Sequence, residues 1–137
     1  MVMHSLAGLP AFAVYFVSAL AMCVVFLLVY TRITPNDEFD LILKEHNATA
    51  AVALGGSLLG FAMPLASAIF NSANILDCVI WGVIALIAQL LAYWLAWLSH
   101  PNLGESIRNN AMAAGLWVAF VSLAAGLLNA ASMSYHE

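Results

Sequence analysis

Four long apolar runs constrain this chain more than any other feature of its sequence. They cover about residues 9–30, 49–70, 78–98 and 111–131. Each run reaches the ~20 residues that an α-helix needs to cross the hydrocarbon core of a bilayer. Inside that core the backbone has no water to bind, so each run must satisfy its N–H and C=O groups within a helix. The sequence therefore predicts an all-α membrane protein with four transmembrane helices.

The composition agrees with this prediction and narrows the classes of function. Of the 137 residues, 65% are hydrophobic and 7% are charged, whereas a soluble domain carries about 25% charged side chains. Three Lys and Arg residues against seven Asp and Glu residues give a net charge of -4, which argues against nucleic acid as a partner. Because the connections are short, we expect one membrane domain over residues 1–137.

The connections also predict the orientation of the chain in the membrane. The basic residues Arg32, Lys44 and Arg108 fall in the first and third connections, which must lie on the same side. The positive-inside rule places that side in the cytoplasm and both termini outside it. The aromatic residues then predict an inner belt of Tyr30, Tyr93, Trp94 and Trp97 and an outer belt of Tyr15, Trp81 and Tyr135.

The two halves of the sequence resemble each other. A Pro-Asn pair follows the first and third runs, and the segments 47–51 and 110–114 both read Asn-Ala-x-Ala-Ala. The pattern suggests a duplicated hairpin, with repeat units at about 9–70 and 78–131. Because each unit has an even number of spans, we expect two tandem hairpins of like orientation, related by a pseudo-twofold axis along the membrane normal.

Small residues distinguish the second and fourth spans from the other two. Gly56 and Gly60 form a GxxxG pair in the second span, and Gly126 lies near the end of the fourth. Small residues let helix backbones approach closely in lipid, where packing and polar contacts replace the hydrophobic effect. We therefore expect the second and fourth spans at the centre of the bundle, with the bulkier first and third spans facing lipid.

Three polar or helix-breaking residues lie deep in the spans. Pro64 has no N–H and so frees the carbonyl of Gly60. Gln89 and Asn129 place amides within the third and fourth spans. These groups can line a path for a solute or ion, but a proline is more often a packing kink and a deep amide more often joins two helices. Both interpretations stay open on the sequence alone.

Reactive groups are sparse within the spans. No Asp, Glu, Lys, Arg or His lies inside them, which argues against a proton pump or an ion-coupled transporter. The spans also lack the paired nucleophile and base of an enzyme. We therefore expect no catalytic site, cofactor or bound metal. The two cysteines, Cys23 and Cys78, are most simply small apolar residues, and the histidines lie at span ends or termini: His4, His46, His100 and His136.

Two connections carry clusters of polar residues. Asn71, Asn74 and Asp77 lie in the second connection and form, with Asn129, either an outward vestibule or an ordinary interface with water.

The first connection predicts a short helix. Residues 34–37 resemble a capped helix start, and Phe39, Ile42 and Leu43 follow at helical spacing. Such a helix would lie on the inner leaflet. Its acidic residues offer a surface for a soluble partner, although a connector that merely rests on lipid is the alternative; these residues are Asp37, Glu38 and Asp40.

Several segments together resemble a known family. They are Tyr30-Thr31-Arg32-Ile33-Thr34-Pro35-Asn36-Asp37-Glu38, Asn47-Ala48-Thr49-Ala50-Ala51, the stretch 55–67, and Leu128-Asn129-Ala130-Ala131. Across essentially the whole chain they are similar to the YjfL-type inner-membrane proteins, a bacterial family of unknown function built from a repeated two-span unit. The resemblance implies a multi-pass protein of the bacterial inner membrane and an association with envelope stress. In that membrane, the orientation predicted from the basic residues places both termini in the periplasm. The resemblance supplies no catalytic residues.

Two functional hypotheses follow. The first is a non-catalytic bundle that assembles with itself or with other membrane proteins, through its small-residue faces and its acidic connection. The second is a conduit for a small solute or ion, lined by the second and fourth spans. The same residues serve as packing in the first hypothesis and as lining in the second: Gly56, Gly60, Pro64, Gln89 and Asn129.

Overall fold

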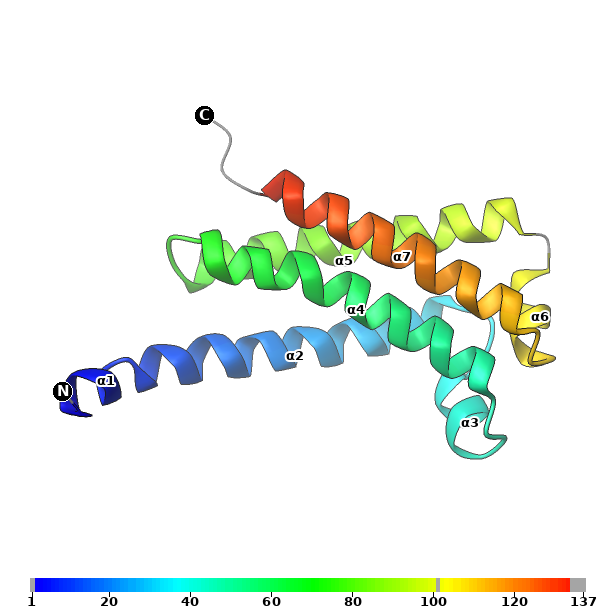
Figure 1. The fold of residues 1–137 in the computed structure, drawn as a ribbon, viewed down its shortest axis with the longest axis horizontal. Coiled ribbons are helices and arrows are strands. Elements are labelled where there is room, and N and C mark those ends of the chain that lie inside the picture. The colour runs from blue at the N-terminus through cyan, green and yellow to red at the C-terminus, as the bar shows by residue number, and fades with distance from the viewer. Residues whose placement is uncertain (1, 101, 134–137) are drawn as a thin grey trace.

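The computed structural model describes residues 2–100 and 102–133, and within them every regular element is a helix (Figure 1). In chain order the elements are α1 (Val2–Leu6), α2 (Leu9–Ile33), α3 (Glu38–Leu43), α4 (Ala48–Asn71), α5 (Ile75–Ser99), α6 (Leu103–Arg108) and α7 (Met112–Met133). The predictions made for Tyr135 and His136 lie outside the described residues.

The four predicted spans are confirmed as the long helices α2, α4, α5 and α7. Each is long and apolar enough to cross a membrane. The predicted short helix is also confirmed as α3, with Asp37 as its N-cap. The helices α1 and α6, of five and six residues, were missed from the sequence.

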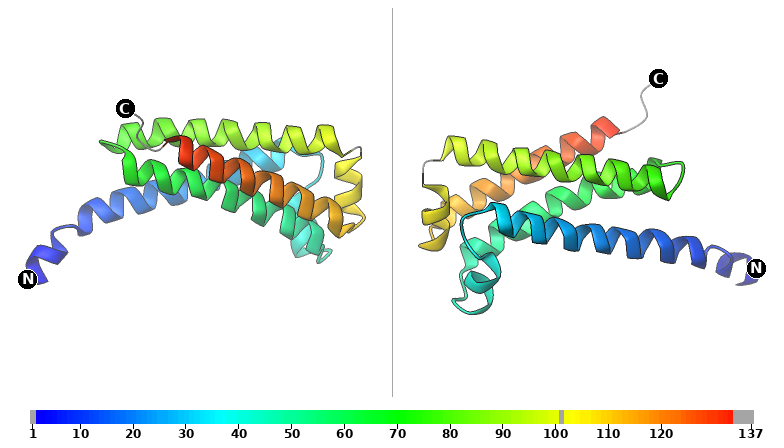
Figure 2. Two further views of the ribbon diagram at one scale, coloured as in Figure 1. Left: turned by 45° about the horizontal axis from the view of Figure 1, so that its top comes forward. Right: turned by 180° about the vertical axis from the view of Figure 1, so that it is seen from behind.

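The long helices alternate in direction along the chain. The helices α3 and α6 lie together at one end of the bundle, which we call the connector end (Figures 1 and 2). The start of α1 and the end of α7 lie at the opposite end, which we call the terminal end. The half of α2 nearer the terminal end diverges from the other helices in all three views.

Two asparagines form hydrogen bonds between the two hairpins at the connector end. Asn47 caps α4, because its Oδ1 accepts from the N–H of Ala50 at 2.9 Å, and its Nδ2 donates to the Ile107 carbonyl at 2.8 Å. Asn110, in the matching position of the second half, accepts from the N–H and the hydroxyl of Thr49 at 3.1 and 2.7 Å. Both side chains therefore bridge the two halves of the chain.

Burial is distributed unequally among the long helices. In the most apolar 18-residue stretch of each, 50% of residues are buried in α4, 33% in α7, 28% in α5 and 6% in the segment that contains α2. The helices α4 and α7 pack along each other, and α5 packs against both. The centre of the bundle is thus the pair α4 and α7, as predicted, but α2 is attached far less closely than α5.

The predicted inner aromatic belt needs a correction. Tyr30 and Tyr93 are 2% and 7% exposed, so they lie inside the bundle and not at a lipid interface. Their rings meet edge to face with centroids 5.4 Å apart. Phe26 continues this cluster and stacks on Phe61 of α4 at 4.8 Å. Tyr30 is buried because these rings surround it, and the cluster joins α2 to the bundle.

Candidate functional site

The glycines of α4 and α7 lie where the two backbones touch. A Cβ atom added to Gly56 would collide with Ala119, and one added to Gly126 would collide with the Gly60 carbonyl. A Cβ on Gly115 would lie 2.6 Å from the Thr49 carbonyl oxygen. No larger side chain fits at these positions, which is the close approach that the small residues predicted. We call this contact between α4 and α7 the seam.

Pro64 of α4 and Gln89 of α5 belong to one hydrogen-bonded arrangement at the seam. Pro64 lacks the N–H that would normally bind the Gly60 carbonyl. The Nε2 of Gln89, which is 1% exposed, donates to that carbonyl at 2.9 Å and to the Ser122 carbonyl at 3.1 Å. Gln89 therefore supplies the donor that Pro64 withholds, and it ties α5 to both helices of the seam.

Hydroxyl groups extend this polar centre toward the connector end. Ser57 donates to the Ala53 carbonyl at 2.8 Å, and its Oγ lies 3.2 Å from the Oγ of Ser122. It also lies 3.3 Å from the phenol oxygen of Tyr30. Ser122 was missed from the sequence, although it follows Ser57 at nearly the spacing of the proposed repeat. Together these groups bind helices to one another, and among the residues that the structure describes the buried Oε1 of Gln89 has no donor.

Asn129 does not join the Gln89 arrangement. It lies seven residues beyond Ser122 in α7, which corresponds to about 10 Å along a helix. Its side chain is half-buried, and its Nδ2 finds no acceptor within the part of the chain that the structure describes. The structure therefore separates two amides that the sequence had grouped as lining of one path.

Of the three acidic residues at α3, two are exposed and one is buried. Asp37 and Asp40 are exposed, and Asp40 pairs with Lys44 at 3.4 Å. Glu38, expected on the same surface, is 5% exposed and faces the bundle. The reason is helical spacing, because the buried Leu41 lies three residues later on the same face.

Glu38 occupies an unusual environment for a carboxyl group. Burial raises its pKa to about 7; a hydrogen bond from the Thr34 side chain lowers it in part, and the nearby Asp37 raises it. Its Oε2 is buried without a hydrogen-bond partner among the residues described. No cation is among the groups that shift this pKa, so the neutral form is more populated here than for a glutamate exposed to water.

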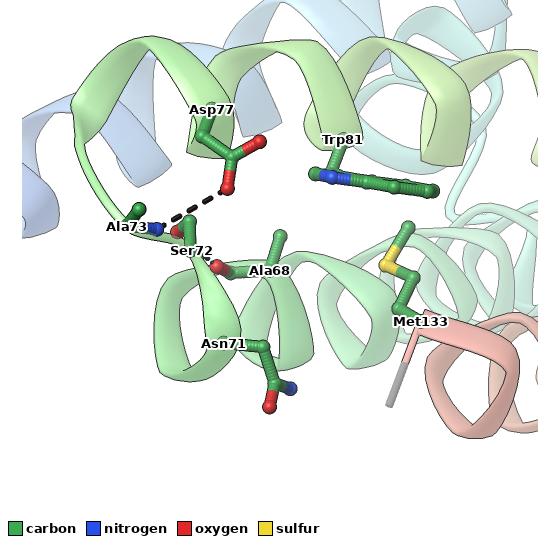
Figure 3. Close-up of a pocket in the computed structure, with 7 residues that line it drawn as sticks. All are labelled: Ala68, Asn71, Ser72, Ala73, Asp77, Trp81 and Met133. Carbon is green, nitrogen blue, oxygen red and sulfur yellow. Dashed lines mark hydrogen bonds between the residues drawn. The ribbon is translucent and has the colours of Figure 1, made fainter. Parts of the chain in front are cut away.

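The polar cluster at the terminal end caps a helix and borders a recess. Asn74 accepts from the N–H of Asp77 at 2.9 Å, and Asp77 accepts from the N–H of Ala73 at 3.2 Å, so both side chains shape the start of α5. The recess has a volume of about 310 Å³ (Figure 3). Its lining residues are Ala68, Asn71, Ser72, Ala73, Asp77, Trp81 and Met133. Asn129, which the sequence placed here, is not among them.

Comparison with known proteins places the chain in a family. Residues 3–133 match a family described as Domain of Unknown Function (DUF350). The chain belongs to this family. Within DUF350 it is 44% identical over 133 residues to UPF0719 inner membrane protein YjfL of Escherichia coli (strain K12), covering 97% of this chain and 100% of the relative. UPF0719 transmembrane protein YshE of Bacillus subtilis (strain 168) is 29% identical over 111 residues, which is 80% of this chain and 81% of that protein.

No solved structure matches the chain. The resemblance to the YjfL-type proteins is thus confirmed, and the chain is a helical membrane protein of a family whose function is unknown.

Proposed function

We propose that this chain is a non-catalytic component of an inner-membrane assembly, and that it associates with a second copy of itself along α2. The observation that carries the proposal is the isolation of α2. Only Phe26 and Tyr30 are buried among its 25 residues. Beyond that aromatic anchor Met22 packs against Gly82 of α5, and residues 9–17 extend toward the terminal end without a buried residue.

A bare apolar helix is not in itself unstable in a bilayer, because lipid tails are as apolar as its side chains. The argument rests on shape. Between the diverging half of α2 and α4 lies an apolar recess of about 350 Å³. It is bordered by two alanines and three aromatic residues of α2 and by one residue of α4: Ala11, Ala19, Phe12, Tyr15, Phe16 and Ile69. Small residues at such a recess permit the close approach of another helix, and a helix is the rigid occupant that gains most from packing there.

The connector end offers the second part of the proposal. The basic residues Arg32, Lys44 and Arg108 all belong to this end, and the positive-inside rule favours placing it in the cytoplasm. The exposed Asp37 and Asp40 then face a soluble partner, if the assembly has one. A fluorophore that is bright only in the cytoplasm tests this orientation, because a bright signal at the C terminus would contradict it.

The seam supports the proposed duplication of a hairpin. Each half consists of a long helix, a six-residue helix and a second long helix. Across the seam Ser57 meets Ser122, 65 positions later, and Gly56 meets Ala119, 63 positions later, so residues separated by about one repeat length contact each other. A pseudo-twofold axis between α4 and α7 would produce such contacts.

A conduit through the seam has less support. The carbonyl of Ser122 and the Oε1 of Gln89 lie within 3 Å of the place where a methyl group on Gly60 would stand. A space that rejects a methyl group rejects a hydrated ion or solute. The association with envelope stress, which the family resemblance implied, stays a prediction that growth of a deletion strain under envelope-damaging conditions would test.

Cysteine cross-linking in native membranes tests self-association. In a background with Cys23 and Cys78 replaced by alanine, single cysteines are placed along residues 9–21 of α2 and oxidised. We expect covalent dimers that rise and fall with the helical period of 3.6 residues. Cysteines along the exposed face of α5, such as Leu91→Cys, are the matched control and should cross-link weakly. An α2 profile that is flat, or no stronger than that of α5, would count against the proposal, as would a strictly monomeric mass in mild detergent.

A further inference from the structure

The recess at the terminal end combines three groups that suit one class of ligand. Asp77 contributes a carboxylate, Trp81 an indole ring and Met133 a thioether. These side chains come from α5 and α7, and alanines of α4 and of the loop after it complete the wall (Figure 3). At about 310 Å³ the recess reaches the lower end of the size range of small-molecule sites.

The charge of the recess is defined by Asp77. Among the residues that the structure describes, all other Asp, Glu, Lys and Arg side chains belong to the connector end or its loops. One carboxylate oxygen accepts from the N–H of Ala73 at 3.2 Å, while the other points away from Ala73, toward the side on which Trp81 lies. Within the described part of the chain, the recess thus presents one negative charge without a neighbouring cationic side chain, and it favours a positive ligand.

The remaining lining selects the kind of cation. A hard metal ion prefers six or more oxygen ligands, but the hydroxyl of Ser72 already donates to the Ala68 carbonyl and the amide of Asn71 to the Ser67 carbonyl at 2.8 Å. An indole ring attracts a cation through its negative face, most strongly when the cation is large and weakly hydrated. Trp81 follows Asp77 by four residues, so ring and carboxylate lie on the same face of α5.

We propose that this recess binds a small organic monocation, with Asp77 as the counter-charge and Trp81 as the aromatic wall. A substituted ammonium group has the required charge, size and weak hydration. Its apolar substituents contact Ala68 and Met133, whose thioether is polarisable and adapts to such a surface. The site is independent of the seam and of the proposed contact along α2.

The test uses the full chain in an uncharged detergent and choline as the probe. The indole ¹⁵N–H signal of Trp81 and the methyl signal of Met133 are followed by nuclear magnetic resonance, and each is assigned by its loss in Trp81→Phe or Met133→Leu. We expect choline to shift both signals saturably. The uncharged molecule of the same shape, 3,3-dimethylbutan-1-ol, should bind about tenfold more weakly, and potassium chloride should cause no saturable shift.

Two substitutions complete the test. Asp77→Asn keeps an acceptor for the Ala73 N–H and should weaken choline binding about tenfold. With Met133 as the reporter, Trp81→Phe should retain binding and Trp81→Leu should lose most of it, while Trp117→Leu, elsewhere on α7, should leave it unchanged. The proposal is overturned if choline causes no saturable shift, if the alcohol or potassium shifts the signals equally, or if Asp77→Asn and Trp81→Leu both bind like the unaltered chain.

Discussion

The helices α4 and α7 and the helix α2 are all apolar, but they are attached to the bundle in different ways. Along the seam, glycine, alanine and serine bring two backbones into contact, and polar groups join them. Along α2, large apolar side chains cover the surface, yet only two of its residues are buried. Within lipid, apolar surface alone does not attach one helix to another, because the attraction between helices comes from close packing and hydrogen bonds. Helix α2 is therefore held by its aromatic anchor and by the contact of Met22 with Gly82, and its N-terminal half has no buried residue.

The largest expected effect on stability comes from a substitution that forces α4 and α7 apart. Gly60→Ala places a methyl group against the Ser122 backbone, and we expect it to lower the free energy of unfolding by about 3 kcal/mol. Gly55→Ala is the matched control in the same helix, because nothing lies within 4 Å of its added Cβ. Its expected effect is neutral or favourable, by at most about 1 kcal/mol. Reversible unfolding in mixed micelles measures both, and equal effects would contradict a close-packed seam.

A second substitution acts on the anchor of α2. Phe26→Ala removes a buried ring from between α2 and Phe61, and we expect a loss of about 2 kcal/mol, because lipid restores part of the lost contact. Leu28, 54% exposed on the same helix and outside the proposed contact along residues 9–21, provides the control. Leu28→Ala should change stability by less than about 0.5 kcal/mol. If the two variants melt alike, α2 is not held by its anchor.

The pH dependence of stability sharpens the account of the connector end, where α2 passes into α3. The pKa of Glu38 rises from 4.5 in the unfolded chain to about 7 in the folded one. Folding therefore favours the protonated form, so this contribution is fully present below pH 4.5 and is lost as the pH rises through 7. We expect a decline of about 1 to 2 kcal/mol over this interval.

Thermal melting between these pH values measures the decline. Glu38→Gln should remove most of the pH dependence, whereas Asp40→Asn, at an exposed acid of the same helix, should retain it. Identical slopes in the unaltered chain and in Glu38→Gln would refute the assignment to Glu38.

The smallest expected effect concerns the hydrogen bond from Gln89 to the Gly60 carbonyl, which Pro64 leaves without its helical N–H donor. Gln89→Leu should cost about 1 kcal/mol, since measured hydrogen bonds between membrane helices are weak. In a Pro64→Ala background the new N–H can bind the Gly60 carbonyl, so the same substitution should cost less, because only the bond to the Ser122 carbonyl is then lost. A double-mutant cycle measures the difference. Additive effects would show that Gln89 does not replace the donor missing at Pro64.

The sequence predicted most of the helices because a bilayer demands long apolar runs, and it predicted the seam because lipid rewards small residues. It predicted Pro64 and Gln89 separately, but only the fold shows that the amide of one binds the carbonyl freed by the other. It misplaced Glu38, because a short connector gives too little periodicity to show which face is buried. It misplaced Tyr30, because an aromatic residue near the end of an apolar run fits an interface with lipid as well as a contact with another helix. The separation of α2 had no signal in the sequence, since a lipid-facing helix and a detached one have the same composition.

The contact between Ser57 and Ser122 provides the most direct test of the seam. Their Oγ atoms lie 3.2 Å apart, so a cysteine pair at these positions is close enough for a disulfide with little adjustment. In membranes, a chain without its native cysteines that carries Ser57→Cys and Ser122→Cys should cross-link rapidly and within one chain. The pair Gly55→Cys and Ser122→Cys should not. Absence of the first cross-link, or its formation only between two chains, would contradict the central place of α4 and α7.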